Sequence, residues 1–206
     1  MKGRLLVALF VAADLASAGE IDLGIAELRR SLRAQVGYCG TLRREVRSKA
    51  LGEAFPDVQR GRFCASSKGE LWIELSAKEG TKTVFARKGR DPAWIRVGHE
   101  APVEFPRERE PDLLRLFGWL LGKGEDLGSF SVESLPGAPG LRFSLLSSDQ
   151  LAELDWYRGA EGSSFPARIS ATDLLGTRND FYFEDVKASS EAELEKVFVA
   201  LRRPRR

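Results

Sequence analysis

Apolar and polar residues alternate along many short stretches of this chain, which is typical of half-buried β-strands. The clearest case is the segment 70–75, where three large apolar residues alternate with Trp72 and Glu74. A Pro-Gly-Ala-Pro-Gly turn signal, 136–140, separates two of the stretches in the second half. The alternation predicts strands over 36–48, 58–66, 70–75, 83–87, 93–97, 129–135, 141–146, 150–158, 165–172 and 179–187.

Two segments follow the helical period instead. Apolar residues from Ile21 to Leu32 recur at helical spacing with arginines on the other faces, which predicts an amphipathic helix over about 21–35. The second segment, 111–122, begins with Pro111, a residue suited to the first position of a helix. Seven of the nine residues from Leu113 to Leu121 are large and apolar, and they run nearly all the way round the helix.

A helix that is apolar on nearly every side must be covered. Leaving the large side chains of 111–122 in water would forfeit roughly 10–20 kcal/mol. The segment is too short to span a bilayer, which takes about 20 residues. A closed core or an apolar cavity of this protein must therefore receive it, and the pattern leaves both possibilities open.

Taken together, the elements predict an α+β fold with a single antiparallel, strongly curved sheet. About 10–11 strands form an incomplete β-barrel, and helices cover its concave face, since a sheet of this many twisted strands tends to coil. A polar segment, 190–196, and an apolar stretch, 197–201, close the chain before an Arg-rich tail. The tail, 202–206, is expected to be a solvated end, with contact to anionic lipid as the alternative.

The first 18 residues have the composition of a signal peptide. A basic start is followed by an uncharged run, 5–13, and by Ala16-Ser-Ala18, an A-x-A cleavage site. The alternative is a buried N-terminal helix. We therefore expect residues 19–206 to form one domain, soluble in a bacterial periplasm. Because that compartment holds no ATP, the function must depend on binding energy or on partners.

Charge and residue inventory exclude several classes of function. Without residues 1–18 the chain carries 30 basic and 29 acidic residues, and this balance argues against nucleic acid as a partner. His99 is the single histidine, and no nucleophile with an oriented base is recognisable beside it. No metal-ligand spacing or phosphate loop occurs. An enzyme is therefore not expected, and neither is a cofactor or a metal.

The two cysteines, Cys39 and Cys64, both fall in predicted strands of a hairpin. Cys39 is an odd number of residues from Leu42, and Cys64 an odd number from Leu71. If both leucines face inward, both sulfurs face outward on the same side of the sheet. In an oxidising compartment this predicts a disulfide, and two free thiols are the alternative.

Several stretches resemble the outer-membrane lipoprotein carrier family of the LolA type. The segment 37–46 after an amphipathic helix is similar to the family's first strand, and Lys68-Gly-Glu-Leu-Trp-Ile73 is similar to its Gly-x-Leu-Trp strand. The segment 181–186, followed by a polar stretch and Val197-Phe198, is similar to the family's ending. The order of elements agrees over nearly all of 20–204.

The resemblance implies an incomplete barrel closed by a helical lid, 111–122, whose cavity carries the acyl chains of lipoproteins or other lipids. It also implies an inner-membrane donor complex and an outer-membrane acceptor, and the carrier itself is expected to be a monomer. Each candidate residue could equally be ordinary core. The lipid-binding candidates are Tyr38, Leu42, Leu71, Ile73, Leu75, Phe130 and Val132 on the sheet, and Leu113, Leu116, Phe117, Trp119 and Leu120 on the lid.

One departure from the family concerns the latch of the lid. The family has an Arg-Pro pair shortly after the Trp of its Gly-x-Leu-Trp strand, and that Arg helps to hold the lid. Leu75 stands at the position that corresponds to the Arg, within Glu74-Leu-Ser-Ala77. A lipid- or lipoprotein-sensing regulatory protein on the same scaffold is therefore the alternative function, ahead of a lipid-modifying enzyme.

Overall fold

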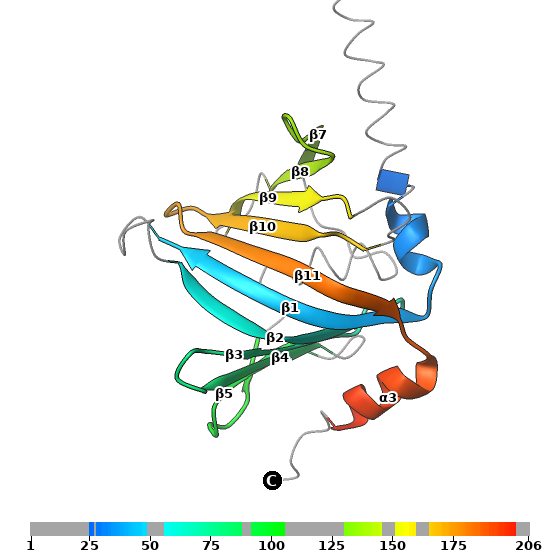
Figure 1. Cartoon of the computed structure of the whole chain (residues 1–206), viewed down its shortest axis with the longest axis vertical. Helices are drawn as coiled ribbons and strands as arrows, with labels where there is room; N and C mark the ends of the chain where they lie inside the picture. The colour runs from blue at the N-terminus through cyan, green and yellow to red at the C-terminus, as the bar shows by residue number, and fades with distance from the viewer. Residues whose placement is uncertain are drawn as a thin grey trace, which may run out of the picture.

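The computed structural model describes residues 25–26, 28–48, 56–87, 92–105, 130–145, 151–159 and 165–200. Within these ranges the chain forms one strongly curved antiparallel sheet of eleven strands (Figure 1). The strands are β1 (Gly37–Arg47), β2 (Asp57–Ser66), β3 (Leu71–Ser76), β4 (Lys82–Arg87), β5 (Trp94–Val97), β6 (Val103–Glu104), β7 (Phe130–Ser134), β8 (Gly140–Leu145), β9 (Leu151–Tyr157), β10 (Arg168–Asp173) and β11 (Arg178–Ala188).

The order of strands across the sheet is β6-β5-β4-β3-β2-β1-β11-β10-β9-β8-β7. Neighbours in sequence are neighbours in space except at the centre, where β1 pairs with β11. These two strands have 11 residues each and join the first half of the chain to the second. In the described part of the chain β6 and β7 are edges, so the sheet is not closed and the predicted incomplete barrel is confirmed.

The pairing of β1 with β11 contains one irregularity. Its register shifts between Cys39 and Thr41, where Asp185 on β11 has a positive φ of 51°. A bulge of this kind bends the strand and increases its twist. The curvature of the sheet is therefore reinforced at its centre, beside the disulfide.

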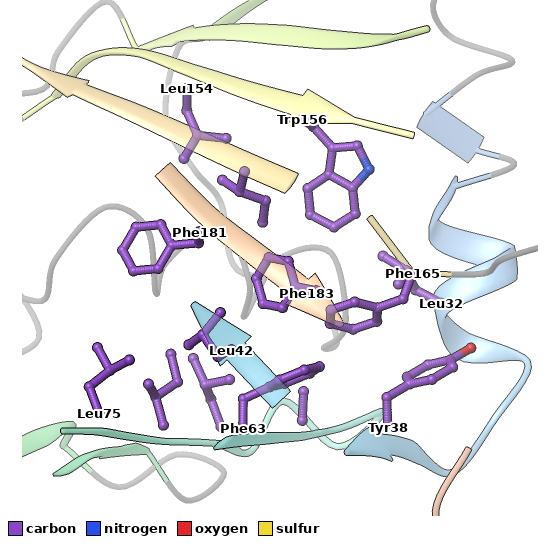
Figure 2. Close-up of a cluster of buried hydrophobic side chains, with 14 of the residues drawn as sticks. Leu32, Tyr38, Leu42, Phe63, Leu75, Leu154, Trp156, Phe165, Phe181 and Phe183 are labelled. Atoms are coloured by element: carbon purple, nitrogen blue, oxygen red, sulfur yellow. The ribbon is translucent and has the colours of Figure 1, made fainter. Parts of the chain in front are cut away.

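The main core lies on one face of the sheet, which we call the inner face and which carries Leu42, Ile73 and Phe183. In Figure 2 Leu154 and Trp156 point from one side toward Leu75 and Phe63 on the other. Leu32, from the helical residues 28–33, is buried in the same cluster. The predicted amphipathic helix is thus confirmed over its described residues, and it packs on the inner face.

The opposite, outer face carries a second cluster that the sequence pattern did not indicate. Helix α3 (Glu191–Ala200) places Leu194 and Phe198 against Trp72 and its outer-face neighbours. The segment 190–196, expected to be a polar connection, is therefore mostly helix. The helix begins with a capping box, because Ser190 Oγ accepts a hydrogen bond from the Glu193 N–H at 3.3 Å and the Ser190 N–H donates to Glu193 Oε2 at 2.9 Å.

Most predicted strands agree with the structure within a few residues, and β6 was missed inside the connection 101–110. The predicted signal peptide, 1–18, and the predicted lid, 111–122, lie outside the described residues. In the described part, no helix is both long enough and apolar enough to cross a membrane.

Candidate functional site

The inner face brings together five of the sequence-predicted lipid-binding residues. These five side chains are buried in one cluster, with at most 6% of their surface exposed: Tyr38, Leu42, Leu71, Ile73 and Leu75. They come from β1 and β3, where the two-residue period of a strand turns alternate side chains to the same face. Val132 of β7 is half-buried against the same cluster.

The other predicted members of the site are not placed by the structure. Phe130 belongs to β7, where its backbone pairs with Leu145 of β8. The lid candidates lie outside the described residues: Leu113, Leu116, Phe117, Trp119 and Leu120. Their contribution to a lipid site therefore stays a prediction.

Sequence reasoning missed the aromatic centre of the inner face. The Phe165 ring lies 5.2 Å from Tyr38, 5.1 Å from Phe63 and 5.2 Å from Phe183, measured between centroids. Phe63 and Phe183 alternate with outward residues on β2 and β11, so strand parity could have identified both. Phe165 precedes β10 but has the same parity as Ile169 in the predicted strand 165–172, so parity could have identified it as well.

The end of the N-terminal helix is tied to the inner face through Tyr38. Its hydroxyl donates a hydrogen bond to the carbonyl oxygen of Ser31 at 3.0 Å. Because Leu32 is buried beside it, the polar tip of Tyr38 is satisfied while its ring remains in the apolar cluster. The helix and β1 are thereby fixed relative to each other.

Charged side chains also lie on the inner face: Arg87 of β4 stands opposite the inward Leu71 and is buried, and Arg44 lies on β1. Arg44 of β1 stands directly opposite Phe181 of β11, and its guanidinium lies 5.8 Å from the Phe181 ring centroid. It donates to Asn179 Oδ1 from Nε at 3.1 Å and from Nη2 at 2.6 Å, and to Gln59 Oε1 from Nη1 at 3.2 Å. Burial lowers the pKa of the Arg44 guanidinium, and the Asp57 carboxylate offsets part of that effect.

The outer face of β8, β9 and β11 is charged and internally paired. Arg142 of β8 donates to both carboxylate oxygens of Asp155 on β9, at 2.7 and 3.0 Å. Arg178 and Asp180 form an ion pair at 3.1 Å on β11. Over these strands the two faces thus differ, because the inner face carries apolar side chains and the outer face carries ion pairs.

The disulfide belongs to the outer face, as strand parity predicts. Cys39 and Cys64 face each other directly across β1 and β2, with 4.2 Å between their Cα atoms, and they are bonded. Closing a loop of this length stabilises the fold by roughly 3–4 kcal/mol. The predicted disulfide is therefore confirmed, and it clamps the two strands beside the central bulge.

Beside α3 the outer face is hollowed into an open groove of about 750 Å³. The disulfide and Trp72 form part of its wall, and Arg62 lies over the Trp72 ring at 5.5 Å. Charged residues of both signs, including Glu74 and Lys187, line the rest. The groove is therefore mixed in character, unlike the inner face.

The described residues contain no cluster of three or more side chains that could hold a metal ion. His99 lies exposed in the turn after β5. The arrangement that stands out chemically is therefore an apolar inner face on which two arginines, Arg44 and Arg87, also lie.

Comparison with known proteins gives a likeness of fold. No protein-family model and no curated protein matches the sequence. A LolA superfamily protein of Nitrosomonas europaea matches with a TM-score of 0.50 at 10% identity, over 85% of this chain and 96% of that one. A DUF1329 family protein of Desulfovibrio piger matches with a TM-score of 0.45 at 10% identity, over 88% and 99% of the two chains. The resemblance drawn from the sequence is thus confirmed for the fold, and this divergent chain has the architecture of a LolA superfamily protein.

Proposed function

We propose that this protein is a periplasmic carrier that shelters the acyl chains of lipoproteins, or of similar lipids, against the inner face of its sheet. The observation that carries the proposal is the inner face itself, a large cluster of buried apolar side chains on a sheet that bends around it without closing. Apolar concave surfaces with few polar groups suit acyl chains. The likeness of fold to a LolA superfamily protein supports the same function.

The proposal includes a cycle of uptake and release. The signal peptide, 1–18, directs the chain across the inner membrane, and the domain 19–206 works in the periplasm. The predicted lid, 111–122, occupies the apolar inner face until cargo displaces it, and we call this segment the plug. The affinity for cargo then depends on the free energy of burying the acyl chain minus that of burying the plug. Cargo can therefore pass to an acceptor that binds it more tightly, without ATP hydrolysis. A donor complex at the inner membrane and an acceptor at the outer membrane complete the cycle.

The first experiment asks whether acyl chains bind at all. Protein purified from a bacterium with an outer membrane is expected to carry an acylated species in native mass spectrometry. After delipidation it should release lipoproteins from spheroplasts. A protein that carries no acyl species and releases no lipoprotein contradicts the proposal.

A matched pair of variants on β7 tests whether the inner face is the binding surface. Val132 packs against the inner cluster, whereas Ser131 is exposed and points to the opposite face. Val132→Asp should weaken binding of a dodecanoyl fluorescent probe about tenfold or more, because a carboxylate cannot be left unpaired in an apolar site. Ser131→Asp should leave the affinity unchanged. Equal effects of the two variants would place the acyl chain elsewhere.

A lipid-sensing regulatory protein on the same scaffold is the second candidate. The open groove beside α3 favours it, because a groove with a tryptophan and charges of both signs suits a protein partner. Capture of a membrane-bound regulator that Trp72→Ala abolishes, together with failure to release lipoproteins, would favour sensing over transport.

A further inference from the structure

Arg44 points to the inner face although it is charged. It lies between Leu42 and Val46 on β1, and residues two apart on a strand share a face. The pairing with β11 is regular here, since the register shift lies earlier, between Cys39 and Thr41. Its partner across the strands is Phe181, which Figure 2 shows beside Leu42 in the cluster.

The neighbours of Arg44 orient its guanidinium without neutralising it. Both residues that accept its hydrogen bonds, Gln59 and Asn179, carry neutral amides. The amide nitrogen of Gln59 donates to Asp57 Oδ2 at 3.3 Å, which turns the amide oxygen toward the arginine. In the described part of the chain, no carboxylate lies within 4.0 Å of Arg44. The positive charge is therefore held in place, and among the described residues the Asp57 carboxylate acts on it from beyond Gln59 without forming an ion pair.

The arginines of the outer face provide the contrast. Arg43, the preceding residue on β1, pairs with Glu45, and its guanidinium covers the Tyr182 ring at 3.9 Å. Arg142 pairs with Asp155 through two hydrogen bonds. Ion pairing is thus the rule where these arginines face outward, and Arg44 departs from it on the face that we assign to the ligand.

Arg44 also retains hydrogen-bonding capacity. A guanidinium has five N–H groups, and the three hydrogen bonds of Arg44 use one each from Nε, Nη1 and Nη2. Among the described residues, no acceptor takes up the second N–H of either terminal nitrogen. Two such groups match the two oxygens of a carboxylate or a phosphate.

We propose that Arg44, oriented by Gln59 and Asn179, binds the anionic headgroup of the amphiphile whose acyl chain lies on the inner face. The proposal rests on the proposed function and adds the ligand's chemical class: a phosphate or carboxylate joined to an acyl chain. The chain packs toward Leu42 and Phe181, and the anion lies at the guanidinium. The anion supplies a direct counter-charge, which no described residue brings within ion-pair distance of Arg44.

The test compares ligands that share a dodecanoyl chain. One pair is dodecanoyl lysophosphatidylglycerol and neutral monododecanoylglycerol, which places the anion on a lipid headgroup. The other is a dodecanoylated peptide with Asp beside the acylated residue and its Asn counterpart, which places the anion on a peptide. The wild-type protein should bind at least one anionic ligand about tenfold more tightly than its neutral counterpart, which is 1.4 kcal/mol. The preference should weaken with added salt, as an electrostatic contact does.

Arg44→Gln should remove the preference by lowering the affinity for the anionic ligand. Arg44→Lys should keep part of it, because a lysine retains the charge without the planar fork. Arg43→Gln, on the outer face of the same strand, is the matched control and should keep the full preference. Circular dichroism and urea unfolding verify that each variant is folded.

The outcomes separate this inference from the proposed function. Binding of all four ligands with no charge preference, or a preference that survives Arg44→Gln, overturns the headgroup site and leaves acyl binding intact. Failure of the wild-type protein to bind any dodecanoyl ligand overturns both.

Discussion

At the scale of single residues, Gly61 is where the sheet depends most on the lack of a side chain. It lies on β2 between its cross-strand partners Leu42 and Leu75. A Cβ atom at this position would lie 1.7 Å from the carbonyl oxygen of Glu74. The neighbouring strand can approach this closely only because glycine leaves the space open.

Gly61→Ala should therefore lower the free energy of unfolding by about 1–3 kcal/mol, since backbone atoms must move to admit the methyl group. Gly80→Asn is the control, because its φ is positive, 87°, and nothing lies within 4 Å of an added Cβ. Asparagine tolerates such a φ, so its effect should be small. Urea unfolding measures both variants, and equal midpoints would contradict the steric argument.

Strand parity could also have identified one residue of the proposed headgroup site. Arg44 stands at an inward position between two apolar residues of β1, and the sequence alone could have raised it as a candidate. Its amide partners could not be predicted in the same way, because Gln59 and Asn179 come from β2 and β11, and their meeting depends on the strand order.

At the scale of elements, the strands were predicted well because alternation is a local property of the chain. Helix α3 was missed because its polar first turn, from Glu191, and its apolar last turn look like two unrelated segments. The capping box of Ser190 and Glu193 was the available signal. No local pattern indicates that α3 covers the outer face, since that depends on Trp72 and Val84 at outward positions of other strands.

The cap of α3 gives a prediction with a defined pH dependence. Ser190→Ala should destabilise the protein by about 1 kcal/mol at neutral pH, while Ser189→Ala should change little. Hydrogen bonds from Ser190 lower the pKa of the Glu193 carboxyl. The folded pKa then lies below the unfolded value of about 4.3, so the stabilisation is complete above that value and is lost as the pH falls through the folded pKa. The backbone N–H of residue 190 still donates to Glu193 in Ser190→Ala, so only the contribution of the hydroxyl should disappear from the difference between the two proteins, measured by urea unfolding, below about pH 4.

At the scale of the whole molecule, the two faces of one sheet differ in composition. The inner face gathers apolar residues from both halves of the chain, and the outer face carries ion pairs, the disulfide and α3. The sequence predicted the curvature and five buried members of the inner face. It could not distinguish a permanent core from a ligand surface, because both require the same apolar side chains.

A double substitution in the proposed plug, Leu116→Ser with Leu120→Ser, separates these two possibilities. If 111–122 competes with cargo, the variant should lose stability without ligand yet bind a dodecanoyl probe more tightly. The reason is that cargo then displaces a weaker competitor, and each 1.4 kcal/mol removed from the plug raises affinity about tenfold.

If the segment is a permanent lining, the affinity should fall with the stability, because the ligand loses apolar contacts. Urea unfolding and probe titration measure the two quantities, and Arg115→Ser is the control that removes no apolar surface of comparable size. The sign of the change in affinity thus decides whether the segment is a plug or a wall.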